Sequence, residues 1–519
     1  MKIVIGYPPL DSAKGVPLLT QNRQFQYFNK PTYIYPMVPA SAASNLAAHG
    51  HEVVWLDGIA EKWTFARWLD ALRAAQPDLL LLETKCPVIR QHWQIARQLR
   101  ECLPTMLQVW VGDHVTYLPH ETFDNAPIDA IITGGDYDFL IVELAAHLTS
   151  GAPLPPGILF PAGHARLRAD NARQETTPGG RAVCTTGPAQ LKHKLDDLPL
   201  IDRDLTHWQL YAYENGNYKY TPGTYVYSGR DCWWNKCTFC VWDHTLNPPG
   251  TYRSFSPERA FAEIKHIVDH YPVKEIFDDA GSIRAGKWLR TFCELMIASG
   301  YNKKVVLGCN MRFDSADEEL YRLMRKANFR FLLYGLESGN QATLDRIQKG
   351  LTPAQIEEGA RMCKAAGLAP HVTVMLGYPW ETLDDAKNTI AFAKKLFKKG
   401  YIDTLQATIC IPYPGTPLHR ECKEHGWLMT EEYEDYDMRR PVMKTCLTDA
   451  QIMGFTQELY KSFLSPAFIL RKVLGVRSWQ DVRFLFMAGT RVLGHLLDFK
   501  PKQKQCGCAE HGQQSKSAR

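Results

Sequence analysis

The chain has 519 residues, more than a single hydrophobic core accommodates, so we expect two or three domains. Hydrophobic residues make up 45% and charged residues 22% of the sequence, the proportions of an ordinary soluble protein. The net charge of +5 is mild, and no dense basic block with interleaved aromatic residues occurs, so nucleic acid is not the expected partner.

No segment of the sequence signals export or membrane insertion. The first residues read as a β-strand and not as a signal peptide, and no apolar run approaches the length of a membrane span. The 14 cysteines are scattered, and most stand singly in apolar segments, which is typical of buried thiols in a reducing compartment. We therefore expect a cytoplasmic protein.

Residues 1–150 alternate between strand and helix patterns and are expected to form a first domain. Strands are predicted at 2–7, 52–56, 78–83, 106–111 and 130–133, and helices at 38–49, 63–75, 88–102 and 138–148. Short apolar strands separated by helices predict a parallel sheet covered on both faces, in a Rossmann-like, flavodoxin-like α/β domain. Such sheets bind ligands at the carboxyl ends of their strands, where the strand order reverses.

Polar and glycine-containing loops follow three of these strands. The candidate ligand-binding residues in them are Thr84, Gly112, Asp113, His114, Thr116, Gly134 and Gly135. One such loop alone is more simply explained by a turn or a helix cap, but three at one sheet edge favour a ligand site. No G-x-G-x-x-G follows the first strand, so a plain dinucleotide site is disfavoured.

Residues 151–222 are expected to be a linker and interdomain segment, because they are rich first in Gly, Pro and charge and then in aromatic residues. A second alternation of strands and helices fills residues 223–430. Its strands are predicted at 225–228, 275–278, 304–309, 331–336, 371–376 and 405–411. Six strand–helix units predict a partial (β/α)6 barrel, in which functional residues sit at the carboxyl ends of the strands.

Three cysteines, Cys232, Cys237 and Cys240, fall within nine residues after the first predicted barrel strand. Three thiolates can hold three irons of a [4Fe–4S] cluster and leave the fourth iron open for chemistry. They are also three ligands of a structural zinc site that His244 would complete. A disulfide is disfavoured because nothing places the chain in an oxidising compartment. The spacing favours the cluster and leaves the zinc site open.

Residues 431–500 are expected to form a helical domain, and the polar tail 501–519 is expected to be disordered. The segment 466–499 carries apolar residues at helical spacing together with several arginines. A helical cap over the barrel is the simpler interpretation. The alternative is a surface that contacts a membrane or a lipid-like substrate.

Taken in order, these motifs resemble a known family: radical S-adenosylmethionine (SAM) enzymes with an N-terminal cobalamin-binding domain. The match spans roughly residues 1–420. The similar features are Gly112-Asp-His-Val-Thr-Tyr-Leu-Pro119, Asp129 to Gly134, the three cysteines, Asp278-Asp279, Arg312, Gly335-Leu-Glu-Ser-Gly339, Lys349-Gly350, Gly377-Tyr-Pro-Trp-Glu-Thr382 and Pro412-Tyr-Pro-Gly-Thr-Pro417. No single piece is decisive, but the ordered set is highly specific.

Three departures from the family pattern stand out. The cysteine motif is C-x4-C-x2-C where the family has C-x3-C-x2-C, so we expect the loop to bulge by one residue and still bind the cluster. The acidic turn at 134–138 is only loosely similar to the acidic turn of the family. The D-x-H-x-x-G signature is absent, which implies base-off cobalamin without a protein histidine on cobalt. His114 is expected near the corrin or its tail, with cobalt ligation left open.

The resemblance implies three cofactors: a [4Fe–4S] cluster, SAM and cobalamin. The implied cluster ligands are the three cysteines, beside the aromatic Phe239, and SAM would bind the open iron. Residues implied around SAM are Asp278, Arg312, Glu337, Ser338, Gly377 and Pro379. Arg312 would pair with the SAM carboxylate, because a guanidinium matches a carboxylate with two parallel hydrogen bonds. No catalytic side chain is assigned.

The implied reaction is C-methylation of an unactivated carbon in a small-molecule, lipid or natural-product substrate. The alternative is a radical cyclisation, ring contraction or oxidation with the same cofactors, and a cobalamin- or cluster-based sensor is a third, weaker hypothesis. An electron donor such as flavodoxin or ferredoxin is the expected protein partner. Peripheral membrane contact through the C-terminal helices is a further expectation.

Overall fold

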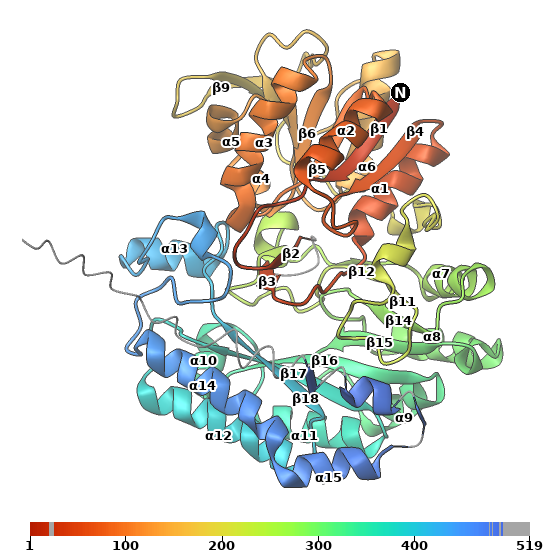
Figure 1. The fold of residues 1–519 in the computed structure, drawn as a ribbon, viewed down its shortest axis with the longest axis vertical. Coiled ribbons are helices and arrows are strands. Elements are labelled where there is room, and N and C mark those ends of the chain that lie inside the picture. Colours follow the sequence, from red (N-terminus) through yellow and green to blue (C-terminus); the bar gives the residue numbers. More distant parts are fainter. Residues whose placement is uncertain (20–24, 477, 480, 487–488, 491–519) are drawn as a thin grey trace, which may run out of the picture.

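The computed structural model describes residues 1–19, 25–476, 478–479, 481–486 and 489–490. The chain forms an upper lobe from its N-terminal third and a lower lobe from the rest, with a short β-hairpin between them (Figure 1). The hairpin pairs β2 (Val16–Leu18) with β3 (Gln26–Phe28). The tail expected to be disordered, 501–519, lies outside the described residues.

The upper lobe is built on a sheet with the strand order β4-β1-β5-β6-β7-β8-β10-β9. Its first five strands are parallel, namely β4 (Glu52–Asp57), β1 (Lys2–Tyr7), β5 (Leu79–Glu83), β6 (Leu107–Val111) and β7 (Ala130–Ile132). The connecting helices are α1 (Met37–Ala48), α2 (Phe65–Ala75), α3 (Ile89–Cys102) and α6 (Tyr137–Ser150), with short α4 (Asp113–Tyr117) and α5 (Pro119–Asn125) after β6. This order is the flavodoxin-like one, with its switch point between β1 and β5, and it confirms the predicted fold class.

The segment expected to be a linker contributes to this sheet. Strands β8 (Ile158–Pro161), β10 (Ala182–Thr185) and β9 (Arg173–Thr176) continue it in antiparallel pairing beyond β7. The prediction was wrong here because each strand has only four residues, flanked by the Gly and Pro residues that usually mark loops. The strands cover what would otherwise be an open edge at β7.

The lower lobe is an open parallel sheet with the strand order β11-β14-β15-β16-β17-β18. The strands are β11 (Gly223–Val226), β14 (Glu275–Asp278), β15 (Val306–Met311), β16 (Phe329–Glu337), β17 (Ala369–Leu376) and β18 (Thr404–Ile409). Helices α7 (Pro257–His270), α8 (Lys287–Ala298), α9 (Glu318–Lys326), α10 (Gln341–Arg346), α11 (Pro353–Ala365) and α12 (Leu383–Lys399) connect them. Consecutive strands are neighbours, so the predicted six-stranded partial barrel is confirmed.

Local signals in the sequence explain where these helices begin. The Ser256 hydroxyl accepts from the backbone N–H of Arg259, with a proline at the first helical position of α7. Thr352 and Gln355 form a reciprocal capping box at the start of α11. Each cap satisfies backbone N–H groups that the first turn of a helix leaves without partners.

Beyond β18 come α13 (Pro417–Glu424), α14 (Asp449–Lys461) and α15 (Pro466–Leu474), with α14 packed on β18 and α12. Residues 431–447, expected to be helical, instead form irregular chain with one 3₁₀ turn, Tyr433–Asp435. This turn packs against residues 86–88 of the upper lobe, and the Tyr433 hydroxyl donates to Glu121. This contact between the two lobes fixes the conformation of residues 431–447. No helix in the described part of the chain is long and apolar enough to cross a membrane.

Gly112 illustrates how tightly the strand ends of the upper lobe pack. Its φ is +120°, and an added Cβ would lie 2.1 Å from the carbonyl oxygen of Thr84. We expect Gly112→Ala to lower the free energy of unfolding by roughly 3 kcal/mol or more, because it combines a strained backbone with a clash against backbone atoms. Urea titration followed by circular dichroism measures this change.

Gly151→Ala is the matched control for this prediction. Gly151 also has a positive φ, +73°, but no atom lies within 4 Å of an added Cβ. Its expected cost is about 1 kcal/mol, from backbone strain alone. Equal destabilisation by the two substitutions would show that the packing against Thr84 does not matter.

Candidate cofactor and substrate site

A cavity of about 730 Å³ fills the inside of the open barrel and reaches the cysteine loop. This volume lies in the range of small-molecule binding sites. Its wall combines the barrel strands with the β2–β3 hairpin, residues 215–218, Met438 and the C-terminal helices. The cavity therefore connects the cysteine loop with parts of the chain that lie far from it in sequence.

Cys232, Cys237 and Cys240 all line this cavity. Burial and the charge of Asp243 raise the pKa of Cys232 to about 12, and burial raises the pKa of the other two thiols as well. The charges of the neighbouring cysteines contribute further to the raised pKa values of Cys232 and Cys240. Because their thiolate forms are unfavourable alone, a bound cationic cluster would supply the missing positive charge.

The cysteine loop contains one residue in the left-handed conformation, Asn235. Asn235 has a φ of +55°, and its side-chain amide donates to Asp243 at 3.2 Å and accepts from the N–H of Gly250. Asparagine tolerates this conformation better than most residues. The three thiols line one cavity. The one-residue bulge relative to the family's loop stays a prediction.

His244, the fourth ligand considered for zinc, bonds elsewhere. Its Nε2 lies 3.2 Å from the carbonyl oxygen of Cys237, to which the ring N–H donates. Within the described ranges, no three His, Cys, Asp or Glu side chains are grouped to hold a single metal ion. The position of His244 favours the cluster over the Cys3His zinc site.

Arg312, Glu337 and Lys349 bring charge to the same end of the cavity. The Lys349 ammonium lies 2.8 Å from a Glu337 carboxylate oxygen, and both side chains are largely buried. The Arg312 guanidinium donates to both oxygens of Asp314, at 3.1 and 2.9 Å, and to the carbonyl of Lys349. It also lies 4.1 Å from the ring centroid of Trp234. Arg312 is thus held in place by its own chain, beside the cysteines.

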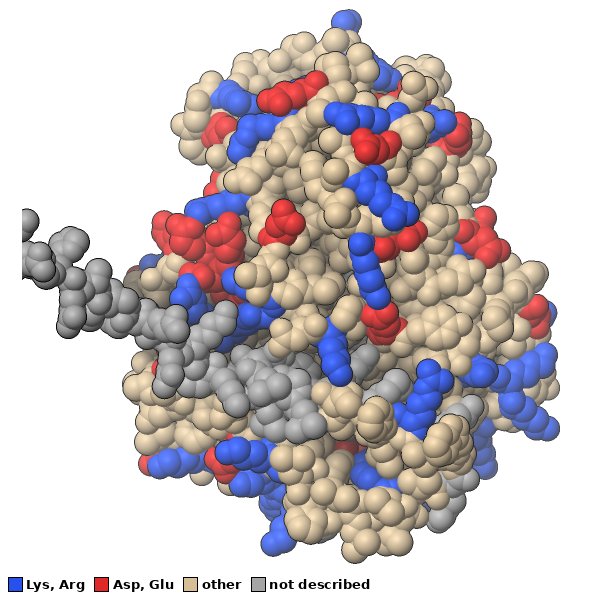
Figure 2. Space-filling model, in the orientation of Figure 1, with Lys and Arg blue, Asp and Glu red and all other residues tan. Residues whose placement is uncertain are grey.

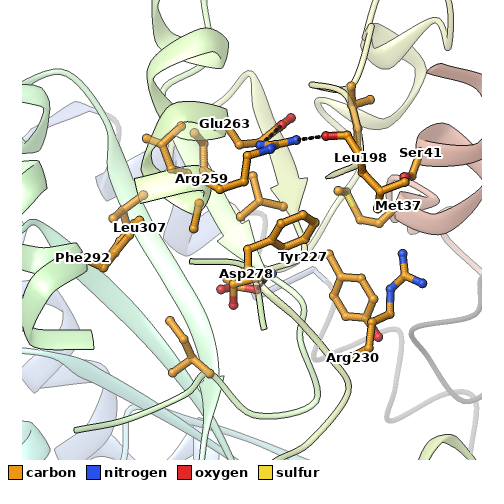
Figure 3. Close-up of a pocket in the computed structure, with 18 of the residues that line it drawn as sticks. Met37, Ser41, Leu198, Tyr227, Arg230, Arg259, Glu263, Asp278, Phe292 and Leu307 are labelled. Atoms are coloured by element: carbon orange, nitrogen blue, oxygen red, sulfur yellow. Dashed lines mark hydrogen bonds and ion pairs between the residues drawn. The ribbon is translucent and has the colours of Figure 1, made fainter. Parts of the chain in front are cut away.

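Of the other residues predicted around SAM, Phe239 lines the cavity and four do not. Asp278 accepts from the N–H groups of Ser228 and Ala280, both at 3.1 Å, and borders a second cavity of about 50 Å³ (Figure 3). Ser338, in the loop after β16, bonds to Thr389 on α12. Gly377 donates to Glu381, and Pro379 lies in the same turn. These four positions shape the loops around the site.

The upper-lobe residues predicted to bind a ligand gather at one sheet edge but do not line the large cavity. Thr84 bonds to His92, Thr116 bonds to the carbonyl of Gly112, and Asp113 lies 3.5 Å from Lys85. His114 packs edge-on against Tyr433 and bonds to Glu121 at 3.1 Å. Asp113 Oδ1 and His114 Nδ1 are buried with no hydrogen-bond partner among the described residues. Unpartnered buried polar atoms at this edge fit a polar ligand group.

The turn after β7 joins the two lobes. Arg230, two residues before Cys232, donates to the carbonyl of Gly135 at 3.0 Å and to the carboxylates of Asp136 and Asp138 at 3.0 and 2.6 Å. Arg253 donates to both oxygens of Asp136, each at 2.7 Å. The N–H of Gly135 donates to the carbonyl of Leu246, just beyond the cysteine loop. Gly135 thus contacts the cysteine-bearing segment directly, whereas the N–H of Gly134 donates to the Thr116 hydroxyl within the upper lobe.

The sequence interpretation missed two contributions to the cavity. The first is the β2–β3 hairpin together with the chain that follows it, which carries no recognisable motif. The hairpin supplies Leu18, Gln26 and Phe28 to the wall, and the following chain supplies Thr32 and Ile34. The second is a set of inward-facing polar residues on β17 and β18, namely His371, Thr373, Thr404, Gln406 and Thr408. Their alternation with apolar residues was a usable signal, because strands buried on both faces are normally continuous apolar runs.

Comparison with known proteins agrees with this geometry. Residues 226–393 match the model of the radical SAM superfamily. An uncharacterized methyltransferase of Pyrococcus horikoshii is 26% identical over 478 residues, 91% of this chain and 95% of that protein. The anaerobic magnesium-protoporphyrin IX monomethyl ester cyclase of Cereibacter sphaeroides is 24% identical over 439 residues, 83% of this chain and 66% of that protein.

Among solved structures, the cobalamin-dependent SAM radical enzyme OxsB, with aqua-cobalamin and SAM bound, has a similar fold. The TM-score is 0.67 at 14% identity, over 96% of this chain and 72% of that one. The lobe with the cysteine loop therefore contains a radical SAM domain, at residues 226–393. The chain is an enzyme that uses SAM and a [4Fe–4S] cluster.

The three cysteines are expected to be required for iron binding. Replacing any one of them with alanine should abolish most iron–sulfur absorbance after anaerobic reconstitution. A [4Fe–4S] cluster with one open iron needs three thiolate ligands, and each variant would keep two. Cys446→Ala is the control, since Cys446 is exposed and does not line the cavity. Full iron content in Cys240→Ala would contradict the assignment of that residue.

Arg230→Met tests the ion cluster between the lobes. It leaves Asp138 buried without its 2.6 Å partner, so we expect a loss of about 3–5 kcal/mol in the free energy of unfolding. Arg290→Met is the control, because Arg290 pairs with Asp317 and Glu319 at the surface and should cost less than about 1 kcal/mol. Urea unfolding of both variants gives the comparison, and equal losses would contradict the prediction.

The same cluster predicts a pH dependence. Burial alone would raise the pKa of Asp136, but the hydrogen bond from Arg253 and the charges of Arg230 and Arg253 hold it below its usual value. The resulting stabilisation is present above the unfolded-state pKa of about 4 and is lost as the pH falls through the lower folded-state pKa. Arg230→Met should therefore lose less stability than the wild type on acidification.

Proposed function

We propose that this chain is a cobalamin-dependent radical SAM C-methyltransferase that acts on an unactivated carbon. The observation that carries the proposal is the cavity itself. Three cysteines open into it at one end, and the turn after β7 of a flavodoxin-like lobe lies against the cysteine-bearing segment. The fold of OxsB and the similarity to a methyltransferase support the same reading.

The cluster, SAM and cobalamin would supply reductive cleavage of SAM, hydrogen abstraction and a transferable methyl group. Cys232, Cys237 and Cys240 would hold the cluster. Arg312 and the Glu337–Lys349 pair stand beside them, where the amino and carboxylate groups of SAM need opposite charges. Because Arg312 is already fixed by Asp314, it would orient a carboxylate without further ordering.

Cobalamin would be held at the carboxyl edge of the upper sheet. The proposed contacts are Thr84, Gly112, Asp113, His114, Thr116, Gly134 and Gly135. The unpartnered Asp113 Oδ1 and His114 Nδ1 support this assignment. His114 already bonds Glu121 through Nε2, which supports a role near the cofactor's periphery and not on cobalt.

An external electron donor such as flavodoxin or ferredoxin would reduce the cluster. Basic and acidic side chains are interspersed over the face shown in Figure 2, with no broad basic area.

Apolar residues exposed on α15 and beyond support peripheral contact of the C-terminal helices with a lipid surface. The expectation of no nucleic-acid partner stays a prediction.

A radical cyclase is the second candidate, and the similarity to the monomethyl ester cyclase favours it. The two reactions differ in where the SAM methyl group goes. In methylation, one SAM donates its methyl group and a second yields 5′-deoxyadenosine, so S-adenosylhomocysteine and 5′-deoxyadenosine form in equal amounts per product. A cyclase transfers no methyl group.

The decisive experiment uses the reconstituted holoenzyme, a strong reductant, SAM with a CD3 methyl group and a small-molecule and lipid extract of the source cells. We expect 5′-deoxyadenosine to form and one extract component to gain the label. A product without the label would favour the cyclase. Absence of any 5′-deoxyadenosine would overturn the proposed enzyme and favour a sensor.

A further inference from the structure

One wall of the large cavity is polar along its length. His371 and Thr373 on β17 and Thr404, Gln406 and Thr408 on β18 alternate at a spacing of two residues, so their side chains face the same side of the sheet. The bonds that three of them make are long: Thr373 to Tyr334, Thr408 to Val374 and Gln406 to Gln26, at 3.3 to 3.5 Å. Such weak bonds leave capacity for a ligand's hydroxyl or carbonyl groups.

Another part of the wall is apolar and aromatic. Phe331 and Leu333 supply it from β16, and the C-terminal elements supply Phe463, Leu464, Phe468, Ile469, Val473, Phe484 and Leu485. Phe463 and Phe468 pack on each other with ring centroids 5.5 Å apart. A polar strip and an apolar strip thus line one continuous space.

The apolar wall continues to the outer surface of the protein. Leu464, Ile469 and Val473 line the cavity, yet they are 50%, 48% and 58% exposed. Leu470 and Leu474 on the same helix are 59% and 64% exposed. Figure 2 shows a largely uncharged area over α15. A contiguous exposed apolar patch at the edge of a cavity indicates a binding surface for apolar groups.

Charge is confined to the other end of the cavity. Arg312, Glu337 and Lys349 lie by the cysteines, whereas Lys472 is the single charged residue that the described C-terminal elements add to the wall. Lys472 lies 2.7 Å from Asp403, which neutralises it. The end near α15 therefore suits an uncharged group and not a phosphate.

From these observations we infer that the substrate is an elongated, uncharged amphiphile, one side apolar and the other carrying hydroxyl or carbonyl groups. Its apolar part lies between β16 and the C-terminal helices and enters past Leu464, Ile469 and Val473. Its polar groups lie along β17 and β18, and its reacting carbon reaches the cysteine end. This inference names the substrate class of the proposed function and rests on it.

The test measures binding of all-trans-retinol, a fluorescent, uncharged, elongated alcohol, to the reconstituted holoenzyme. The wild type should bind retinol saturably, and Val473→Asp should weaken binding by about tenfold or more, because it places a carboxylate in the apolar wall. Leu474→Asp is the control on the same helix. Leu474 is as exposed as Val473 but does not line the cavity. The affinity of Leu474→Asp for retinol should therefore stay within about twofold of the wild-type value.

Leu333→Gln provides a second variant inside the barrel, in case the helix is perturbed, and it should also weaken retinol binding. Formation of 5′-deoxyadenosine without substrate is measured in parallel for the wild type and for Leu474→Asp, and it should be the same in both. That readout tests the proposed function independently of retinol binding. Absence of saturable binding by the wild type, or equal losses in Val473→Asp and Leu474→Asp, would overturn the inferred substrate class.

Discussion

The buried ion cluster of Arg230, Arg253, Asp136 and Asp138 is the constraint on which the rest of the structure depends. It places two guanidinium groups and two carboxylates at the junction of the lobes, with distances of 2.6 to 3.2 Å. Buried charges are tolerated only when their partners are well placed, because each has lost its hydration. The two lobes therefore have one favourable arrangement, and the cysteine loop is fixed within it.

This arrangement brings together two sites that the chain builds separately. The flavodoxin-like sheet presents its ligand edge at the carboxyl ends of its strands, and the barrel presents its mouth in the same way. Because Arg230 precedes Cys232 by two residues and contacts the turn after β7, both edges meet at the cysteine loop. A reaction that needs two cofactors beside one substrate requires such a meeting.

The polarity of the cavity wall changes along the length of the cavity. Near the cysteines, Arg312 and the Glu337–Lys349 pair offer the charges that a zwitterionic ligand needs. Near α15, the wall is apolar on one side and carries weakly bonded hydroxyl and amide groups on the other. A single space with these two ends is suited to a charged co-substrate and an uncharged substrate at the same time.

The sequence by itself determined the parallel strands of both sheets and the cysteine triad, because short apolar runs, helix caps and short-range spacing are local properties. It did not reveal β8 to β10, four-residue strands that extend the sheet in succession: β8 pairs with β7, β10 with β8 and β9 with β10. Nor did it reveal that Tyr433 covers His114, or that the β2–β3 hairpin and α15 wall the cavity. Those contacts join residues more than a hundred positions apart, so only the packing of the folded chain decided them.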